Sequence, residues 1–105
     1  MEIRVMRQVA REIEKESQEL KESIYSVLNR IQEGERVSMP LCKPLFDISH
    51  GLYELRLSYQ AGEYRVFYYI KVKEAIYVIH AMKKKSQKLD FKTVALLKNR
   101  IRSLG

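Results

Sequence analysis

Basic residues with one acidic neighbour recur in the middle of the chain. Glu54 and Arg56 lie two residues apart, Arg65 follows nine residues later, and His80 precedes the basic run Lys83-Lys84-Lys85. A guanidinium group binds phosphate oxygens through a planar fork, and fixed cations stabilise the charge that develops during phosphoryl transfer. The two histidines have no cysteine or histidine at the spacing of metal ligands. The sequence therefore offers no plausible metal cluster and predicts no cofactor, and its basic residues are candidates for binding phosphate.

The charge is divided unevenly along the chain, whose net charge is +7. Residues 1–51 contain 8 Lys/Arg and 9 Asp/Glu, a net charge of −1, whereas residues 52–105 contain 12 and 4, a net charge of +8. Such an asymmetry indicates a polyanionic partner, and nucleic acid is the usual one. From composition alone, a basic, solvated surface that has no partner is an equally good interpretation of this charge.

The length and composition indicate one small domain over residues 1–105, since 46% of the residues are hydrophobic. No stretch approaches 18 apolar residues, so we expect no membrane span. The first residues lack the apolar region of a signal peptide. The single Cys42 cannot form an internal disulfide, which suits a reducing cytosol, and we expect it to be a small buried hydrophobe. These features predict a cytoplasmic protein.

Three strand-like runs contain or adjoin the basic residues. They are Leu52–Tyr59, Tyr64–Lys71 and Ala75–Met82, which are rich in Tyr, Val, Ile and Leu. Turns are expected at Ala61-Gly62 and at Lys73-Glu74. Connections this short favour antiparallel neighbours, because a parallel crossover needs a dozen or more residues. The runs therefore predict a three-stranded antiparallel meander.

Strand alternation predicts which side chains share a face. It places Glu54 and Arg56 on one side of the first strand, and Arg65 on one side of the second. We expect one face of the sheet to meet the helices and the opposite face, with both arginines, to be a partly open basic surface. Neighbouring arginines repel unless an anion lies between them. Glu54 or a bound phosphate would each satisfy this requirement.

The third strand has its own alternation, and this determines the surroundings of His80. A regular strand would place Ile76, Val78, His80 and Met82 on one face, alternating with Tyr77, Ile79 and Ala81. A histidine among apolar neighbours is more often a buried structural residue than a proton carrier.

The flanking segments are predicted to be helical. Residues 3–33 keep the spacing of an amphipathic helix, and no Pro or Gly interrupts them before Gly34. One helix of this length would be about 42 Å long, so we favour a helical hairpin that breaks at residues 17–19 with a serine as N-cap. Residues 2–5 form either a short strand or the helix start. Residues 37–51 read as a connector, and a last helix follows Asp90 and ends at Leu104.

Three motifs in order resemble one protein family. They are Leu52-Tyr53-Glu54-Leu55-Arg56, then Tyr64-Arg65-Val66-Phe67-Tyr68, then the run from His80 to Lys88. They are similar to the RelE/HigB-like toxins of type II toxin–antitoxin systems, in particular the phage-derived branch. The sequence departs from the family pattern at Met82, where Phe is usual, and at residues 89–90, where Thr-Pro is usual. The resemblance implies an α+β, RelE/ParE-like fold, with an N-terminal helical hairpin packed on a small antiparallel sheet and a C-terminal helix.

The resemblance also implies an activity. Such toxins are metal-independent endoribonucleases that cleave messenger RNA on the ribosome, where the 2′-OH attacks the adjacent phosphate. The implied catalytic residues are Glu54, Arg56, Arg65, Lys84 and Lys85, and the implied RNA-binding residues are His80, Lys83 and Lys88. We expect Arg65 to clamp the phosphate and one of the two lysines to serve the leaving group. Glu54 either orients an arginine, which we favour, or accepts the 2′ proton.

The implied partners are mRNA, the ribosome and a helix-turn-helix antitoxin, and no membrane is involved; whether the free toxin is a homodimer stays open. Two other functions remain as alternatives. The ParE toxins share the fold and poison DNA gyrase without cutting RNA, but they lack the full set of arginines and lysines present here. A basic RNA-binding module would instead stack bases on its aromatic residues. The strand alternation of these aromatics favours core packing over stacking.

Overall fold

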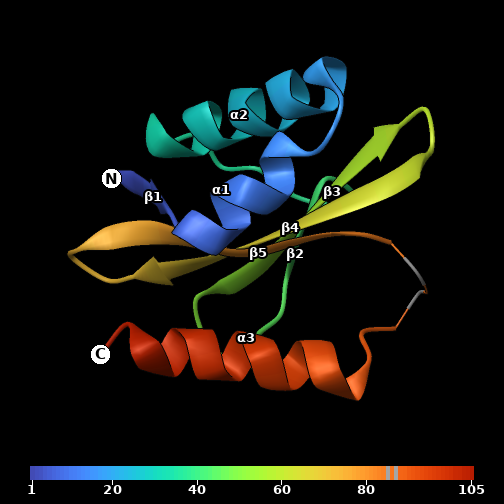
Figure 1. Cartoon of the computed structure of the whole chain (residues 1–105). Coiled ribbons are helices and arrows are strands. Elements are labelled where there is room, and N and C mark those ends of the chain that lie inside the picture. Colours follow the sequence, from blue (N-terminus) through green and yellow to red (C-terminus); the bar gives the residue numbers. More distant parts are fainter. Residues whose placement is uncertain (85, 87) are drawn as a thin grey trace.

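The computed structural model describes residues 1–84, 86 and 88–105. Over these residues the fold is α+β, with three helices and a mixed five-stranded sheet in the order β1-β5-β4-β3-β2 (Figure 1). The elements are β1 (Ile3–Val5), α1 (Arg7–Glu14), α2 (Gln18–Gln32), β2 (Cys42–Pro44), β3 (Leu52–Tyr59), β4 (Gly62–Lys71), β5 (Ala75–Lys83) and α3 (Phe91–Ser103). The helices α1 and α2 lie on one face of the sheet and α3 lies on the other.

The helical segments begin at polar caps. The predicted break between two N-terminal helices is confirmed: Ser17 precedes α2, and its hydroxyl accepts a hydrogen bond from the Leu20 amide at 3.2 Å. Asp90 caps α3 in the same way, through the Thr93 amide at 2.7 Å. Gly34 follows α2 with a φ of +94°, the left-handed conformation expected after a helix. None of the described helices is long and apolar enough to cross a membrane.

The predicted meander is confirmed, but the prediction of an antiparallel sheet is wrong at one edge. β3, β4 and β5 are antiparallel neighbours, whereas β1 pairs with β5 in parallel, with Ile3 opposite Ile76. The segment before α1 is therefore a strand. β2 lies inside the predicted connector and pairs with β3. Both added strands have only three residues, too few for a hydrophobic period to be recognised in the sequence.

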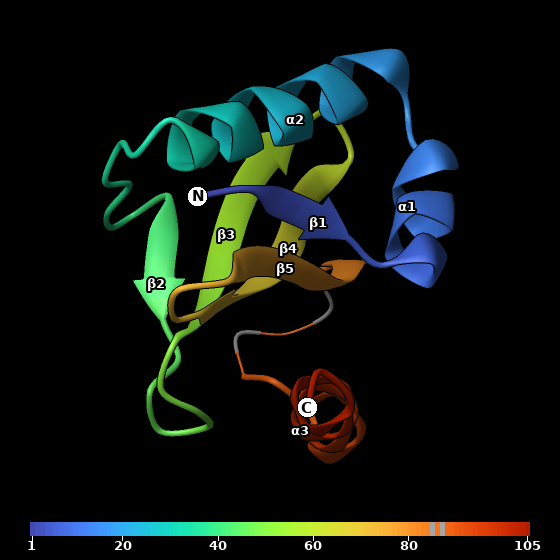
Figure 2. The ribbon, with the colours of Figure 1, turned by 90° about the vertical axis from the view of Figure 1, so that its left-hand side faces the viewer.

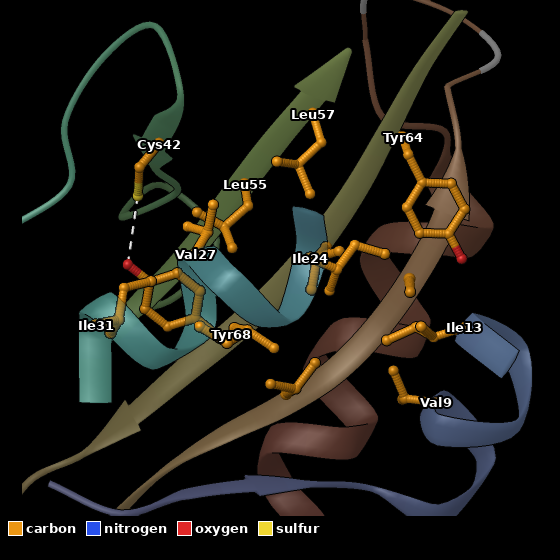
Figure 3. Packing of buried hydrophobic residues seen from close by; sticks show 14 of the residues in the cluster. Val9, Ile13, Ile24, Val27, Ile31, Cys42, Leu55, Leu57, Tyr64 and Tyr68 are labelled. Carbon is orange, nitrogen blue, oxygen red and sulfur yellow. Dashed lines mark hydrogen bonds between the residues drawn. The ribbon is translucent and has the colours of Figure 1, made fainter. Parts of the chain in front are cut away.

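The larger hydrophobic core lies between the sheet and the helices α1 and α2 (Figure 3). The helices contribute Val9, Ile13 and Ile24, which are at most 1% exposed. Cys42 is buried as expected, and its Sγ lies 3.3 Å from the hydroxyl of Tyr68 in a hydrogen bond. Burial raises the pKa of the Cys42 thiol, which keeps the group protonated and unreactive.

A second, smaller core forms where α3 crosses the opposite face of the sheet (Figure 2). Leu97 of α3 is fully buried against a cluster that includes Leu52, Phe67 and Ile79. The expectation that this face is partly open is therefore wrong for Arg65, which is only 1% exposed. The physical reason is that α3 uses its apolar stripe to cover the sheet.

A β-bulge changes the alternation of β5. Phe67 of β4 pairs with His80, but the next residue of β4, Tyr68, pairs with Val78, so Ile79 is an extra residue. After the bulge, Ala81 packs in the larger core, whereas Met82 packs in the smaller one. His80 stacks on Phe67, on the face that α3 covers. The prediction that His80 and Met82 share a face with Ile76 and Val78 is therefore wrong, because one inserted residue reverses the order of faces.

Candidate functional site

Two arginines on neighbouring strands share one carboxylate. Arg56 of β3 lies directly opposite Arg65 of β4. Arg56 Nε donates to Glu54 Oε1 at 2.9 Å, and Arg65 Nη1 lies 3.4 Å from Glu54 Oε2. Glu54 is only 1% exposed. Its position between the two guanidinium groups offsets their repulsion, as one of the two alternatives left open by the sequence requires.

The arginine pair lies in the wall of a cavity of about 540 Å³, which we call the Arg56 cavity. Five cations and two carboxylates are among its lining residues, which gives it a net charge of +3. The lining residues are Lys43, Leu45, Asp47, Ile48, Glu54, Arg56, Arg65, Lys88, Leu89, Val94 and Lys98. The arrangement suits an anionic ligand that needs several positive contacts.

A second carboxylate lies on the other side of Arg65. Glu63 Oε1 is 3.9 Å from Arg65 Nε and 3.5 Å from Lys84 Nζ. The backbone carbonyl of Glu63 also accepts a hydrogen bond from the Lys84 amide at 2.8 Å. Lys84 is therefore held next to the arginine pair by both its main chain and its side chain.

His80 and Arg65 line a second cavity of about 440 Å³, which we call the His80 cavity. This cavity lies among α1, β5, α3 and the segment that precedes α3, and it shares Arg65, Lys88 and Leu89 with the Arg56 cavity. Arg100 Nη1 donates to the carbonyl of Ile79 at 2.6 Å and lies 3.4 Å from His80 Nδ1. Burial, assisted by the nearby charge of Arg100, lowers the pKa of His80 to about 4. His80 is consequently neutral at pH 7.

The structure places most of the predicted site residues together. Glu54, Arg56, Arg65 and Lys88 line the Arg56 cavity, and His80 lines the adjoining one. Lys84 joins the group through Glu63, whereas Lys83 is exposed at the end of β5 and is not among the described lining residues of either cavity. Lys85 lies outside the described residues.

The sequence did not indicate several charged residues of the site. Lys98 follows Val94 by four residues, one turn of α3, so it faces the same cavity, but its role becomes visible only once α3 is placed. Lys43 belongs to the unexpected strand β2. Glu63 and Arg100 act on Lys84 and His80 through contacts between distant segments. Within the described part of the chain, no group of three or more His, Cys, Asp or Glu is placed to hold a metal ion.

The lowered pKa of His80 predicts a pH-dependent stability. Between pH 6.5 and about 4 the unfolded chain binds a proton at His80 that the folded protein does not, so the free energy of unfolding falls as the pH falls. Urea unfolding measured from pH 7.5 to 4.5 should show this slope, and His80→Phe should reduce it. His50→Gln, which removes the only other histidine, is the control and should keep the slope. An unchanged slope in His80→Phe would contradict the assignment.

Comparison with known protein families relates the chain to one of them. Residues 11–102 match the family described as "Phage derived protein Gp49-like (DUF891)". Searches of curated proteins and of solved structures find no match. The matched region includes all the described lining residues of both cavities except Gln8 and Val9, near the start of α1. Since it also covers most of the sequence, the chain belongs to the Gp49-like family of phage-derived, toxin-like proteins.

Proposed function

We propose that the protein is the toxin of a type II toxin–antitoxin system and a metal-independent endoribonuclease that cleaves mRNA on the ribosome. In this proposal its fold is of the RelE/ParE kind, as the resemblance to RelE/HigB-like toxins implies. Membership of a toxin-like family supports the first part. The Arg56 cavity carries the second, because its net charge of +3 and its oriented arginine suit a phosphodiester.

The proposed reaction is an internal transesterification. The 2′-oxygen forms a bond to phosphorus while the bond from phosphorus to the 5′-oxygen breaks, leaving a 2′,3′-cyclic phosphate and a 5′-hydroxyl. One proton leaves the 2′-hydroxyl and one reaches the departing 5′-oxygen. The transition state concentrates negative charge on the phosphoryl oxygens, so cations fixed before substrate arrives lower the barrier.

The burial of the two arginines separates their roles. The side chain of Arg56 is 24% exposed and lines the cavity, so Arg56 is the residue proposed to contact the phosphate. Arg65 is buried beside Glu54, so its proposed role is to support the contact between Arg56 and the phosphate from within the cavity wall. This role replaces the expectation from the sequence that Arg65 itself clamps the phosphate. Both Glu54 oxygens lie beside guanidinium groups, which suits the orienting role proposed for this carboxylate.

The lysines complete the proposed site. Lys84, held by Glu63, is suited to protonate or stabilise the leaving 5′-oxygen. Lys88 lines both cavities and is proposed to bind the RNA backbone with Lys43 and Lys98. Lys85 keeps the catalytic role, and Lys83 the RNA-binding role, that the resemblance implies.

RNA cleavage can be tested directly. After induction in bacteria, mapping of transcript 5′ ends should show new ends within translated messages. In vitro, cleavage of mRNA on ribosomes should leave 5′-hydroxyl ends, and an all-deoxy substrate should be inert because it lacks the nucleophile. Growth arrest with intact mRNA and trapped DNA gyrase would contradict the proposal and favour a ParE-like activity.

The two arginines should respond differently to truncation. Arg56→Ala should lower the cleavage rate by about 10²- to 10³-fold, and it should lower the free energy of unfolding less than Arg65→Ala does, because Arg56, which also pairs with Glu54, is partly exposed. Arg65→Ala should also lower the free energy of unfolding, by about 3–5 kcal/mol, because it removes a partner of the buried Glu54. Arg102→Ala, an exposed arginine on α3, is the matched control for both measurements. Cleavage by Arg56→Ala at the normal rate would exclude its proposed role.

A nuclease of this kind needs a partner that masks it. We propose a helix-turn-helix antitoxin with an acidic surface, since residues 52–105 carry a net charge of +8 and complementary charge speeds association. Co-expression with the product of an adjacent gene should restore growth. The complex should form more slowly as salt rises. A neighbouring gene product that neither co-purifies nor restores growth would count against this partner.

A further inference from the structure

The N-terminal end of α3 exposes an aromatic side chain, Phe91, which lies outside the described lining of the two cavities. Phe91 is 89% exposed, more than any other large hydrophobic residue described. Its neighbours Asp90 and Lys92 both line the His80 cavity. A single exposed apolar residue is common on protein surfaces, so the meaning of Phe91 depends on the groups around it.

Three lysines that line the cavities have no acidic partner within the described structure. Lys88 and Lys92 line the His80 cavity, and Lys88 and Lys98 line the Arg56 cavity, yet no described carboxylate lies within ion-pair distance of these three. Lys15, Lys21 and Lys71, which lie elsewhere, each pair with a glutamate. Charges that are not neutralised internally are available to an anionic ligand.

The two cavities adjoin each other at shared lining residues. They share Arg65, Lys88 and Leu89, so a strand whose phosphate lies in the Arg56 cavity has an adjoining place in the His80 cavity. The His80 cavity, at about 440 Å³, falls within the range of about 300–1,000 Å³ that is typical of small-ligand pockets. Phe91 lies at the end of the helix that borders both cavities.

We propose that the N-terminal end of α3 is a binding subsite for single-stranded RNA, in which Phe91 stacks on the base that flanks the cleaved phosphodiester. Lys88 and Lys92 bind the phosphates of the same segment. A flat aromatic face beside free cations is the usual platform for an unpaired base, because every base offers a π-face to it. The inference rests on the proposed RNA cleavage and extends it by assigning the contacts outside the reacting phosphate.

Tryptophan fluorescence can report this stacking directly, since the chain contains no tryptophan. Phe91→Trp places one fluorophore at the subsite. Val72→Trp is the matched control, because Val72 is 77% exposed in the turn beside Lys71, which binds the opposite end of α3 through the carbonyl of Leu104. The probe is a single-stranded RNA hexanucleotide with 2′-O-methyl groups, which cannot be cleaved. Titration should quench Phe91→Trp to saturation and leave Val72→Trp unchanged.

Affinity measurements separate stacking from simple apolar contact. Phe91→Ala and Phe91→Leu should both weaken binding of the hexanucleotide by about 5- to 100-fold, whereas Phe91→Tyr should bind normally. Lys92→Ala should reduce the slope of log affinity against log salt by about 0.7, the value for one lost phosphate contact.

The outcomes distinguish this subsite from the proposed function. If the protein cleaves mRNA but Phe91→Trp is not quenched and Phe91→Leu binds normally, the subsite is wrong and the proposed function stands. If Phe91→Leu weakens only antitoxin binding, the surface docks a protein and the subsite is again wrong. If the unmodified protein neither binds nor cleaves RNA, both proposals fail.

Discussion

The carboxylate of Glu54 is the group on which the arrangement of the site depends. The register of β3 and β4 places Arg56 and Arg65 opposite each other, an arrangement that is unfavourable without an anion between them. Glu54 supplies that anion, and the carboxylate of Glu63 lies on the other side of Arg65. Charges removed from water need partners. The excess positive charge of the Arg56 cavity, +3 over its lining residues, includes Lys43, Lys88 and Lys98 and is available for a ligand.

The rest of the structure brings further groups to this pair. The larger core fixes the sheet from the side of α1 and α2, and so leaves the opposite face for α3 and the site. The bulge at Ile79 turns His80 toward that face. Arg100 donates a hydrogen bond to the backbone carbonyl of Ile79, the extra residue of the bulge. β-bulges often occur next to active sites, where they redirect a side chain. Here one extra residue in β5 determines which side chains face Arg65.

Local signals in the sequence predicted the elements that hold the site. The three long strands have alternating apolar residues, and Ser17 and Asp90 are N-cap residues whose hydrogen bonds involve amides only three residues away. The missing parts depend on contacts between distant segments. The burial of Arg65 follows from the position of α3, and the surroundings of His80 follow from a bulge that leaves no mark in the composition. The resemblance to a toxin family identified most of the cations but not Lys43 or Lys98, which only the assembled cavity reveals.

The distribution of the cavity walls along the chain has a consequence for the protein during its own synthesis. The walls come from β2, residues 45–48, β3, β4, residues 88–89 and α3, and β1 pairs with residues more than 70 positions further along. A chain is made from its N-terminus, and contacts between distant residues form only after both have been made. A nascent chain that has not yet reached Lys98 lacks one wall of the Arg56 cavity and the helix that completes the second core. Incomplete products of translation therefore cannot form the full basic site. Only chains whose synthesis has passed α3 can form it.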